Sequence, residues 1–210
     1  MPSQANNKTS KKDKTIVVGI SGASGAVYAR RMLAMLDADD RVGKVIVVVT
    51  HGGQRLLRDE LQLKVQDVLR LPEELLGKAS SKFESIPVGD IGGSIASGSF
   101  ATDGMVIVPC SMATLGAIAS GISDNLLRRA ADVHLKEGRT LLLCWRDTPL
   151  NMIHLENMTR LARAGAVNFP INPGYYFPQP KLDDMITQFC CRVLARLGLE
   201  QDAQFRWQGE

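Results

Sequence analysis

Two loops rich in small residues contain the first groups that could do chemistry. The run GISGASGA, Gly19–Ala26, places three glycines and two serines between a β-branched run and a helical pattern. Small residues there let backbone N–H groups approach an anion at a helix N-terminus. The loop has neither GxGxxG nor Walker A spacing, which disfavours a dinucleotide, ATP or GTP. It indicates either a tight turn without a ligand or a contact for a mononucleotide phosphate or the edge of an isoalloxazine ring.

A second loop, PCSMATL, follows another apolar run. Its Ser111 and Thr114 are placed to open a helix and to offer hydroxyls and amides to a second ligand surface. Cys110 is a candidate nucleophile, but no acid–base partner pattern surrounds it, so a small buried thiol is the favoured interpretation.

Three cations and one carboxylate are candidates for ligand contacts. Arg129 and Lys136 are seven residues apart and would share one face of a helix, which suits either a phosphate or a solvated surface. Arg146 and Asp147 follow an apolar run, at the end of a strand where ligands bind in parallel sheets. The alternative for these two is a structural ion pair beside a turn.

The segment Ile171–Asp184 contains Pro173, Pro178 and Pro180, which fix the shape of a loop, and tyrosines that could lie over a ligand or belong to a rigid surface connection. Its Asp183–Asp184 pair does not complete a DDxxD magnesium motif, because the fifth position is Thr187, so it is interpreted as an acidic helix N-terminus. Four cysteines and three histidines form no zinc pattern, and we expect no metal.

The elements that must position these residues alternate along the chain. Apolar runs predict strands, and spacings of three and four residues predict helices between them. This order predicts a single-domain α/β fold with a parallel sheet and helices on both faces. The predicted strands are 15–20, 44–50, 104–110, 139–145 and, shorter, 166–170; the predicted helices are 26–36, 52–63, 65–71, 111–120, 124–137 (capped by Ser123 or Asp124), 151–164 and 182–197.

Composition narrows the class of protein. The 210 residues are 45% hydrophobic and 22% charged, as in globular proteins, with a net charge of +3. That balance, with only 5% aromatic residues, disfavours nucleic acid as the main ligand. No apolar stretch approaches the roughly 18 residues of a membrane span, and the N-terminus lacks the apolar core of a secretory signal. We expect a cytoplasmic protein with reduced thiols, a disordered tail over 1–14, one domain over 15–200 and a C-terminal tail over 201–210.

Several ordered motifs resemble the UbiX-type flavin prenyltransferases: SGASGA, PCSMxTL, SDNLLxRAAD, R-x-TPL, PGYY, RVL and the closing FRWQG. The resemblance covers about residues 15–200. It implies a Rossmann-like or flavodoxin-like three-layer fold and a homo-oligomer, typically a dodecamer. It also implies binding of reduced FMN and dimethylallyl monophosphate, formation of a fourth ring on the flavin, and delivery of the product to a UbiD-type decarboxylase. Whether the pathway is ubiquinone biosynthesis or aromatic acid decarboxylation stays open, as does monophosphate against diphosphate.

The resemblance also assigns residues. It implies that Glu60 is an acidic residue near the flavin. The chain departs from the family pattern at two positions, where Ala113 replaces a frequent Lys and Asp147 replaces the usual Glu. FMN contacts fall on Gly22, Ala23, Ser24, Thr50, Ser111, Met112, Ala113, Thr114 and Arg146. Contacts to the prenyl phosphate fall on Arg129, Lys136, Tyr176 and Arg192.

The chemistry expected is ionisation of an allylic C–O bond without metal. Arg129, Lys136 and Arg192 would neutralise the leaving phosphate, and Trp145 or Tyr176 could flank the cation. Glu60, Asp147 and the bound phosphate are the candidates for acid–base work. One alternative is an FMN-dependent decarboxylase of aminoacyl-cysteine substrates. His51 lies about where such an enzyme has its catalytic His, but a PxMNxxMW-like motif is missing. A second alternative is a non-catalytic flavin carrier, which would not need the three cations.

Overall fold

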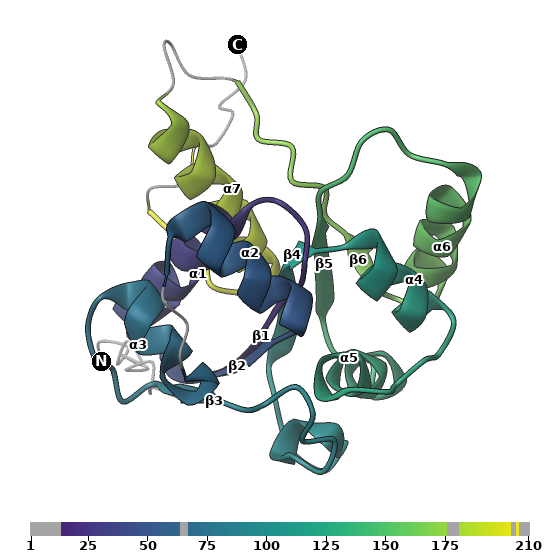
Figure 1. Ribbon diagram of the computed structural model, residues 1–210, viewed down its shortest axis with the longest axis horizontal. Helices are drawn as coiled ribbons and strands as arrows, with labels where there is room; N and C mark the ends of the chain where they lie inside the picture. Colours follow the sequence, from purple (N-terminus) through teal and green to yellow (C-terminus); the bar gives the residue numbers. More distant parts are fainter. Residues whose placement is uncertain (1–13, 64–66, 176–180, 203–204, 206–210) are drawn as a thin grey trace, which may run out of the picture.

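A computed structural model describes residues 14–63, 67–175, 181–202 and 205. Six parallel strands form one sheet in the order β3-β2-β1-β4-β5-β6 (Figure 1). The strands are β1 (Lys14–Ile20), β2 (Val42–Val49), β3 (Phe83–Ser85), β4 (Gly104–Cys110), β5 (Leu141–Trp145) and β6 (Val167–Asn168). The predicted α/β fold with a parallel sheet is confirmed.

Helices cover both faces of this sheet. They are α1 (Ala26–Ala38), α2 (His51–Leu61), α3 (Leu71–Leu76), α4 (Met112–Ala119), α5 (Leu126–Lys136), α6 (Met152–Arg163) and α7 (Leu182–Arg196), with short 3-10 helices η1 (Val68–Arg70) and η2 (Ser94–Ala96).

Alternation along β1 explains the two layers of helices. Ile16, Val18 and Ile20 point into a core shared with α1, α2, α3 and α7, whereas Val17 points into a second core shared with α4, α5 and α6. All four side chains are fully buried. A strand buried on both faces reads as a continuous apolar run, and this is why its position could be predicted.

Three details differ from the sequence expectations. The strand β3 was not predicted. A helix was expected over 65–71, but residues 64–66 lie outside the described part and α3 instead begins at Leu71, with Pro72 tolerated in its first turn. The N-cap of α5 is Asn125, whose side chain accepts a hydrogen bond from the Arg128 N–H at 3.1 Å, and neither Ser123 nor Asp124.

The strand order reverses between β1 and β4. From β1 the chain proceeds outward to β2 and β3, and then returns to β4 on the other side of β1. In parallel sheets, ligands bind beyond the carboxyl ends of the strands at such a switch point. The two small-residue loops lie there, because one follows β1 and the other follows β4.

Candidate active site

The carboxyl ends of four strands bring the proposed flavin contacts to one edge of the sheet. Gly22–Ser24 follow β1, Thr50 follows β2, Ser111–Thr114 follow β4 and Arg146 follows β5. Hydrogen bonds join neighbouring ends: the Thr50 N–H donates to the Ile20 carbonyl at 3.0 Å, and the Ser21 N–H donates to the Pro109 carbonyl at 3.0 Å.

Backbone approaches backbone between the first two loops. A Cβ placed on Gly22 would lie 3.1 Å from the carbonyl carbon of Gly52, closer than almost all real contacts of a Cβ atom. The loops therefore present main chain where a side chain would otherwise fill the space. Two hydroxyls at this edge already have partners within the chain: the Thr50 Oγ1 caps α2 by accepting from the Gly53 N–H at 3.0 Å, and the Ser24 side chain hydrogen-bonds Glu60.

Hydroxyl groups tie the β1 and β4 ends together. The buried Ser21 Oγ accepts a hydrogen bond from the Ser111 N–H at 2.8 Å. The Ser111 Oγ in turn caps α4 by accepting from the Thr114 N–H at 3.2 Å and contacts the Thr114 Oγ1 at 3.1 Å. The sequence pattern did not single out Ser21; its signal is a serine placed directly after a strand buried on both faces.

Glu60, at the end of α2, reaches the N-terminus of α1. Its Oε2 accepts hydrogen bonds from the Ala26 N–H at 2.8 Å and the Gly25 N–H at 3.0 Å. Burial alone would raise the pKa of Glu60, but hydrogen bonds from Ser24, Ala26 and Gly25 and the charge of Arg146 lower it below its ordinary value. The anion at this helix N-terminus is therefore the protein's own carboxylate, which is ionised at neutral pH.

Other residues of the edge differ in accessibility. Arg146 and Asp147 are exposed, and the Asp147 Oδ1 accepts a hydrogen bond from the Thr148 N–H at 2.9 Å. Cys110 is fully buried, and burial raises the pKa of its thiol to about 12. It is protonated at neutral pH, which supports a packing role over a nucleophilic one.

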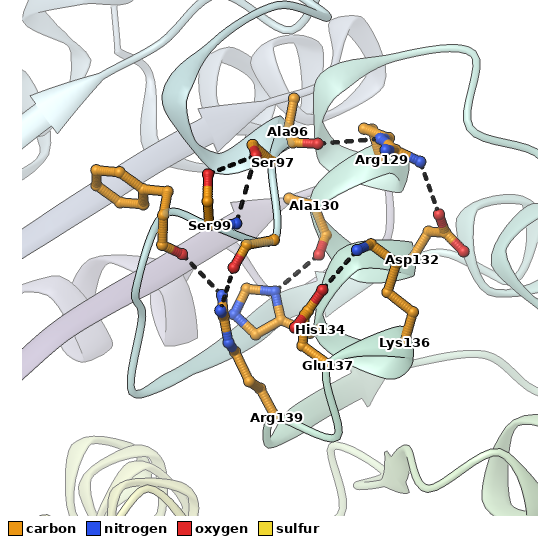
Figure 2. Close-up of polar contacts among 12 residues, drawn as sticks. Ala96, Ser97, Ser99, Arg129, Ala130, Asp132, His134, Lys136, Glu137 and Arg139 are labelled. Atoms are coloured by element: carbon orange, nitrogen blue, oxygen red, sulfur yellow. Dashed lines mark hydrogen bonds and ion pairs between the residues drawn. The ribbon is translucent and has the colours of Figure 1, made fainter.

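The α5 cations form a separate cluster (Figure 2). The Arg129 Nε donates to the Ala96 carbonyl at 3.1 Å, and its Nη1 pairs with Asp132 at 3.0 Å. The Lys136 Nζ pairs with Glu137 at 2.5 Å. These side chains are 38% and 47% exposed, so both cations remain accessible to a ligand.

Arg192 lies elsewhere, on α7. It lines a groove of about 710 Å³ together with Phe169, Pro173, Gly174 and Phe189, and its guanidinium carbon lies 6.0 Å from the centre of the Phe169 ring. Tyr176, two residues beyond Gly174, lies outside the described residues.

A single chain does not bring the proposed phosphate contacts together. The helix α5, which carries Arg129 and Lys136, packs on one face of the sheet, and α7, which carries Arg192, packs on the other. In Figure 1 the two helices lie on opposite sides of the strands.

Comparisons with known proteins define the class. The family model named Flavoprotein matches residues 4–188. The chain thus belongs to a flavoprotein family, as the α/β fold and the loops at its switch point already indicated.

Closer relatives name the subfamily. The chain is 41% identical over 193 residues to the flavin prenyltransferase UbiX of Halalkalibacterium halodurans, covering 92% of this chain and 93% of that protein. It is 42% identical over 199 residues to that of Escherichia coli strain K12, covering 93% and 99%. This chain is a member of the UbiX family of flavin prenyltransferases.

Solved structures agree. A crystal structure of AnUbiX (PadA1) in complex with FMN and dimethylallyl pyrophosphate matches with a TM-score of 0.81 and 36% identity, covering 94% of this chain and 98% of that one. A dodecameric FMN-dependent UbiX-like decarboxylase from Escherichia coli O157:H7 matches with a TM-score of 0.81 and 37% identity, covering 93% and 100%. The cysteine decarboxylase TvaF, at 21% identity and a TM-score of 0.57, shares the fold alone.

Two kinds of feature are absent from the described residues. No helix there is long and apolar enough to span a membrane. No group of three or more His, Cys, Asp or Glu side chains there is placed to hold a metal ion.

Proposed function

We propose that the protein transfers a dimethylallyl group from dimethylallyl monophosphate to N5 and C6 of reduced FMN. The observation that carries this proposal is the convergence of four strand ends, which gathers Gly22–Ser24, Thr50, Ser111–Thr114 and Arg146 at the switch point of the sheet. Membership of the UbiX family supports the reaction type.

The flavin would occupy that edge. Gly22, Ala23 and Ser24 face one part of the ligand and Ser111, Met112, Ala113 and Thr114 another, with Thr50 and Arg146 available to the phosphate. Reduced FMN, when bound, supplies the electron-rich N5 and C6 atoms that accept the allyl group. The protein's own work is to orient the two reactants and to neutralise the leaving group.

Arg129, Lys136, Tyr176 and Arg192 would hold the donor phosphate. Breaking an allylic C–O bond leaves charge on the phosphate, and three cations offset it without a metal. Because α5 and α7 lie on opposite faces of one sheet, we infer that different copies of the chain contribute them. A homo-oligomer, dodecameric like the Escherichia coli O157:H7 relative, would then be required for activity.

Glu60 and Asp147 divide the proton transfers. Glu60 is ionised at neutral pH and can therefore accept a proton, and its lowered pKa makes it a weaker base than an ordinary glutamate. Asp147 is exposed and one methylene shorter than Glu, so we propose that it reaches the donor phosphate through a water molecule.

The product is proposed to serve a UbiD-type decarboxylase in the cytoplasm. All four cysteines of the chain are free and buried, which is consistent with a reducing compartment. Ubiquinone biosynthesis and aromatic acid decarboxylation both fit this chemistry.

Mass spectrometry of the extracted flavin tests the proposal. Protein incubated anaerobically with reduced FMN and dimethylallyl monophosphate should yield a flavin heavier by one dimethylallyl unit, and excess EDTA should leave the rate unchanged. The diphosphate should react more slowly under the same conditions. Unmodified flavin, or activity lost with EDTA and restored by magnesium, would contradict the proposal.

A further inference from the structure

The loop from Ala96 to Thr102, between η2 and β4, is fastened to α5 and to the residues that follow it (Figure 2). Arg139 provides most of this attachment. Its Nη2 donates to the Gly98 carbonyl at 2.5 Å, and its Nη1 donates to the Phe100 carbonyl at 2.8 Å. One planar guanidinium thus donates to two carbonyl groups from two different nitrogen atoms, a fork geometry that the single nitrogen of an ammonium does not reproduce.

His134 holds the other end of this loop. Its Nδ1 lies 2.7 Å from the Ala130 carbonyl, and a carbonyl accepts only, so Nδ1 carries the proton. In the neutral ring Nε2 is then an acceptor, and it receives the Thr102 hydroxyl at 2.9 Å. Burial lowers the pKa of His134, which keeps the ring neutral and this arrangement in place.

The loop also contacts the two α5 cations. The Ala96 carbonyl accepts from the Arg129 Nε at 3.1 Å. A Cβ placed on Gly98 would overlap the carboxylate of Glu137 and lie 2.8 Å from the Lys136 Nζ. The loop therefore lies directly against the Lys136–Glu137 ion pair, with no room for a side chain at position 98.

We propose that Arg139 and Gly98 are positioning residues for the donor phosphate, because they hold the loop at the distance that orients Arg129 and Lys136. This inference rests on the proposed function of those two cations. Arg139 itself is directed at the carbonyl groups of the loop, so its role is to position the cations and not to bind the phosphate.

Calorimetric titration of dimethylallyl monophosphate into protein loaded with oxidised FMN tests the proposal, because oxidised flavin allows donor binding without turnover. Arg139→Lys keeps the charge but loses the planar donation to two carbonyls, and should weaken donor binding by about tenfold or more. Gly98→Ala should do the same by displacing Lys136. Its neighbours there are the ends of flexible side chains, so the fold should survive.

Two matched variants sharpen the experiment. Arg41→Lys is the control: Arg41 likewise donates to a carbonyl, that of Glu200 at 2.8 Å, but it directly precedes β2 and not β5, and donor affinity should not change. Glu137→Ala in the Gly98→Ala background removes the carboxylate that the new methyl group would overlap, and should restore most of the donor affinity.

FMN affinity, melting temperature and oligomeric size are measured on the same samples and should match wild type. If wild-type protein neither binds the donor nor prenylates flavin, the proposed function fails. If wild type does both and Arg139→Lys and Gly98→Ala bind the donor as wild type does, the positioning role is wrong while the function stands. Loss of FMN affinity or assembly in step with donor affinity, or no rescue by Glu137→Ala, also overturns it.

Discussion

Arg129 and Lys136 each have an acidic partner in this chain, Asp132 for the first and Glu137 for the second. These pairs are partly exposed, and pairs of that kind contribute about 1 kcal/mol or less. A phosphate, with more charge and more acceptor atoms than a carboxylate, can displace them. Both cations are therefore able to exchange a carboxylate for a phosphate when the donor binds.

Replacing either cation should slow the reaction strongly and leave flavin binding intact. Arg129→Ala and Lys136→Ala should slow single-turnover prenylation by roughly 30- to 1,000-fold, which corresponds to on the order of 2–4 kcal/mol of transition-state stabilisation. FMN occupancy should persist, because neither residue lies in the flavin loops. Tyr176→Phe should be milder, since it removes one neutral hydroxyl.

Arg128 is the matched control for these variants. It adjoins Arg129 but pairs with Asp124, at 2.8 Å. Arg128→Ala should prenylate at the wild-type rate. Equal losses of prenylation rate in Arg128→Ala, Arg129→Ala and Lys136→Ala would indicate that the α5 cations act only through their overall positive charge.

Glu60→Gln separates two tasks of one carboxylate. The amide oxygen can still accept a hydrogen bond from the Ala26 N–H, so α1 should remain capped and the melting temperature should change little. The amide cannot accept a proton, and the rate should fall by about 10²- to 10⁴-fold. The prenylation rate is measured by stopped flow and the melting temperature by a thermal melt. A marked fall in melting temperature together with the fall in rate would contradict the assignment.

At the scale of the elements, the long strands were predictable and the short ones were not. β1, β2, β4 and β5 coincide within two residues with apolar runs, because strands buried on both faces must be apolar throughout. β3 is three residues long, contains the exposed Glu84 and lies at the edge of the sheet beside β2, so its pattern carries no comparable signal. Ser123, Asp124 and Asn125 are all good N-cap residues, and only tertiary packing selects Asn125.

The N-cap of α5 should matter for stability. Asn125→Ala removes the acceptor of the Arg128 N–H and should cost about 1 kcal/mol, which lowers the melting temperature of a domain this size by about 2–4 °C. Ser123→Ala should have a smaller effect. A calorimetric scan of both variants checks this, and a larger loss in Ser123→Ala would show that the helix is capped differently.

His134 makes the attachment of α5 sensitive to pH. Burial first, and the charge of Arg139 as well, lower its pKa below the ordinary 6.5, while the hydrogen bond to Ala130 acts against them. The unfolded chain therefore binds a proton below about pH 6.5 that the folded chain does not. Protonation of His134 therefore does not affect stability above that pH, and the free energy of unfolding falls as the pH decreases below it.

Urea unfolding between pH 7 and pH 5 measures this effect. The free energy of unfolding should fall with decreasing pH in wild type, and the slope should be shallower in His134→Gln, whatever the absolute stability of that variant. An identical slope in the two proteins would mean that His134 is not the group responsible.

At the scale of the whole molecule, the sequence could locate the candidate site residues but not their relative placement. The spacing of Arg129 and Lys136 predicts that they share a helix face. It does not predict that α5 packs against Val17 and Ile107 while α7 packs against Ile16 and Val106, on the other side of the sheet. If these residues bind one phosphate, as proposed, that separation requires a second copy of the chain.

Complementation between subunits tests this claim most directly. Lys136→Ala and Arg192→Ala chains carrying different tags are co-expressed, and mixed oligomers are isolated through both tags. If one site takes Lys136 from one chain and Arg192 from another, random mixing leaves about a quarter of the sites intact, and the mixed oligomers should prenylate FMN at about a quarter of the wild-type rate. Each variant alone should be nearly inactive. Mixed oligomers no more active than the separate variants would contradict a site shared between chains.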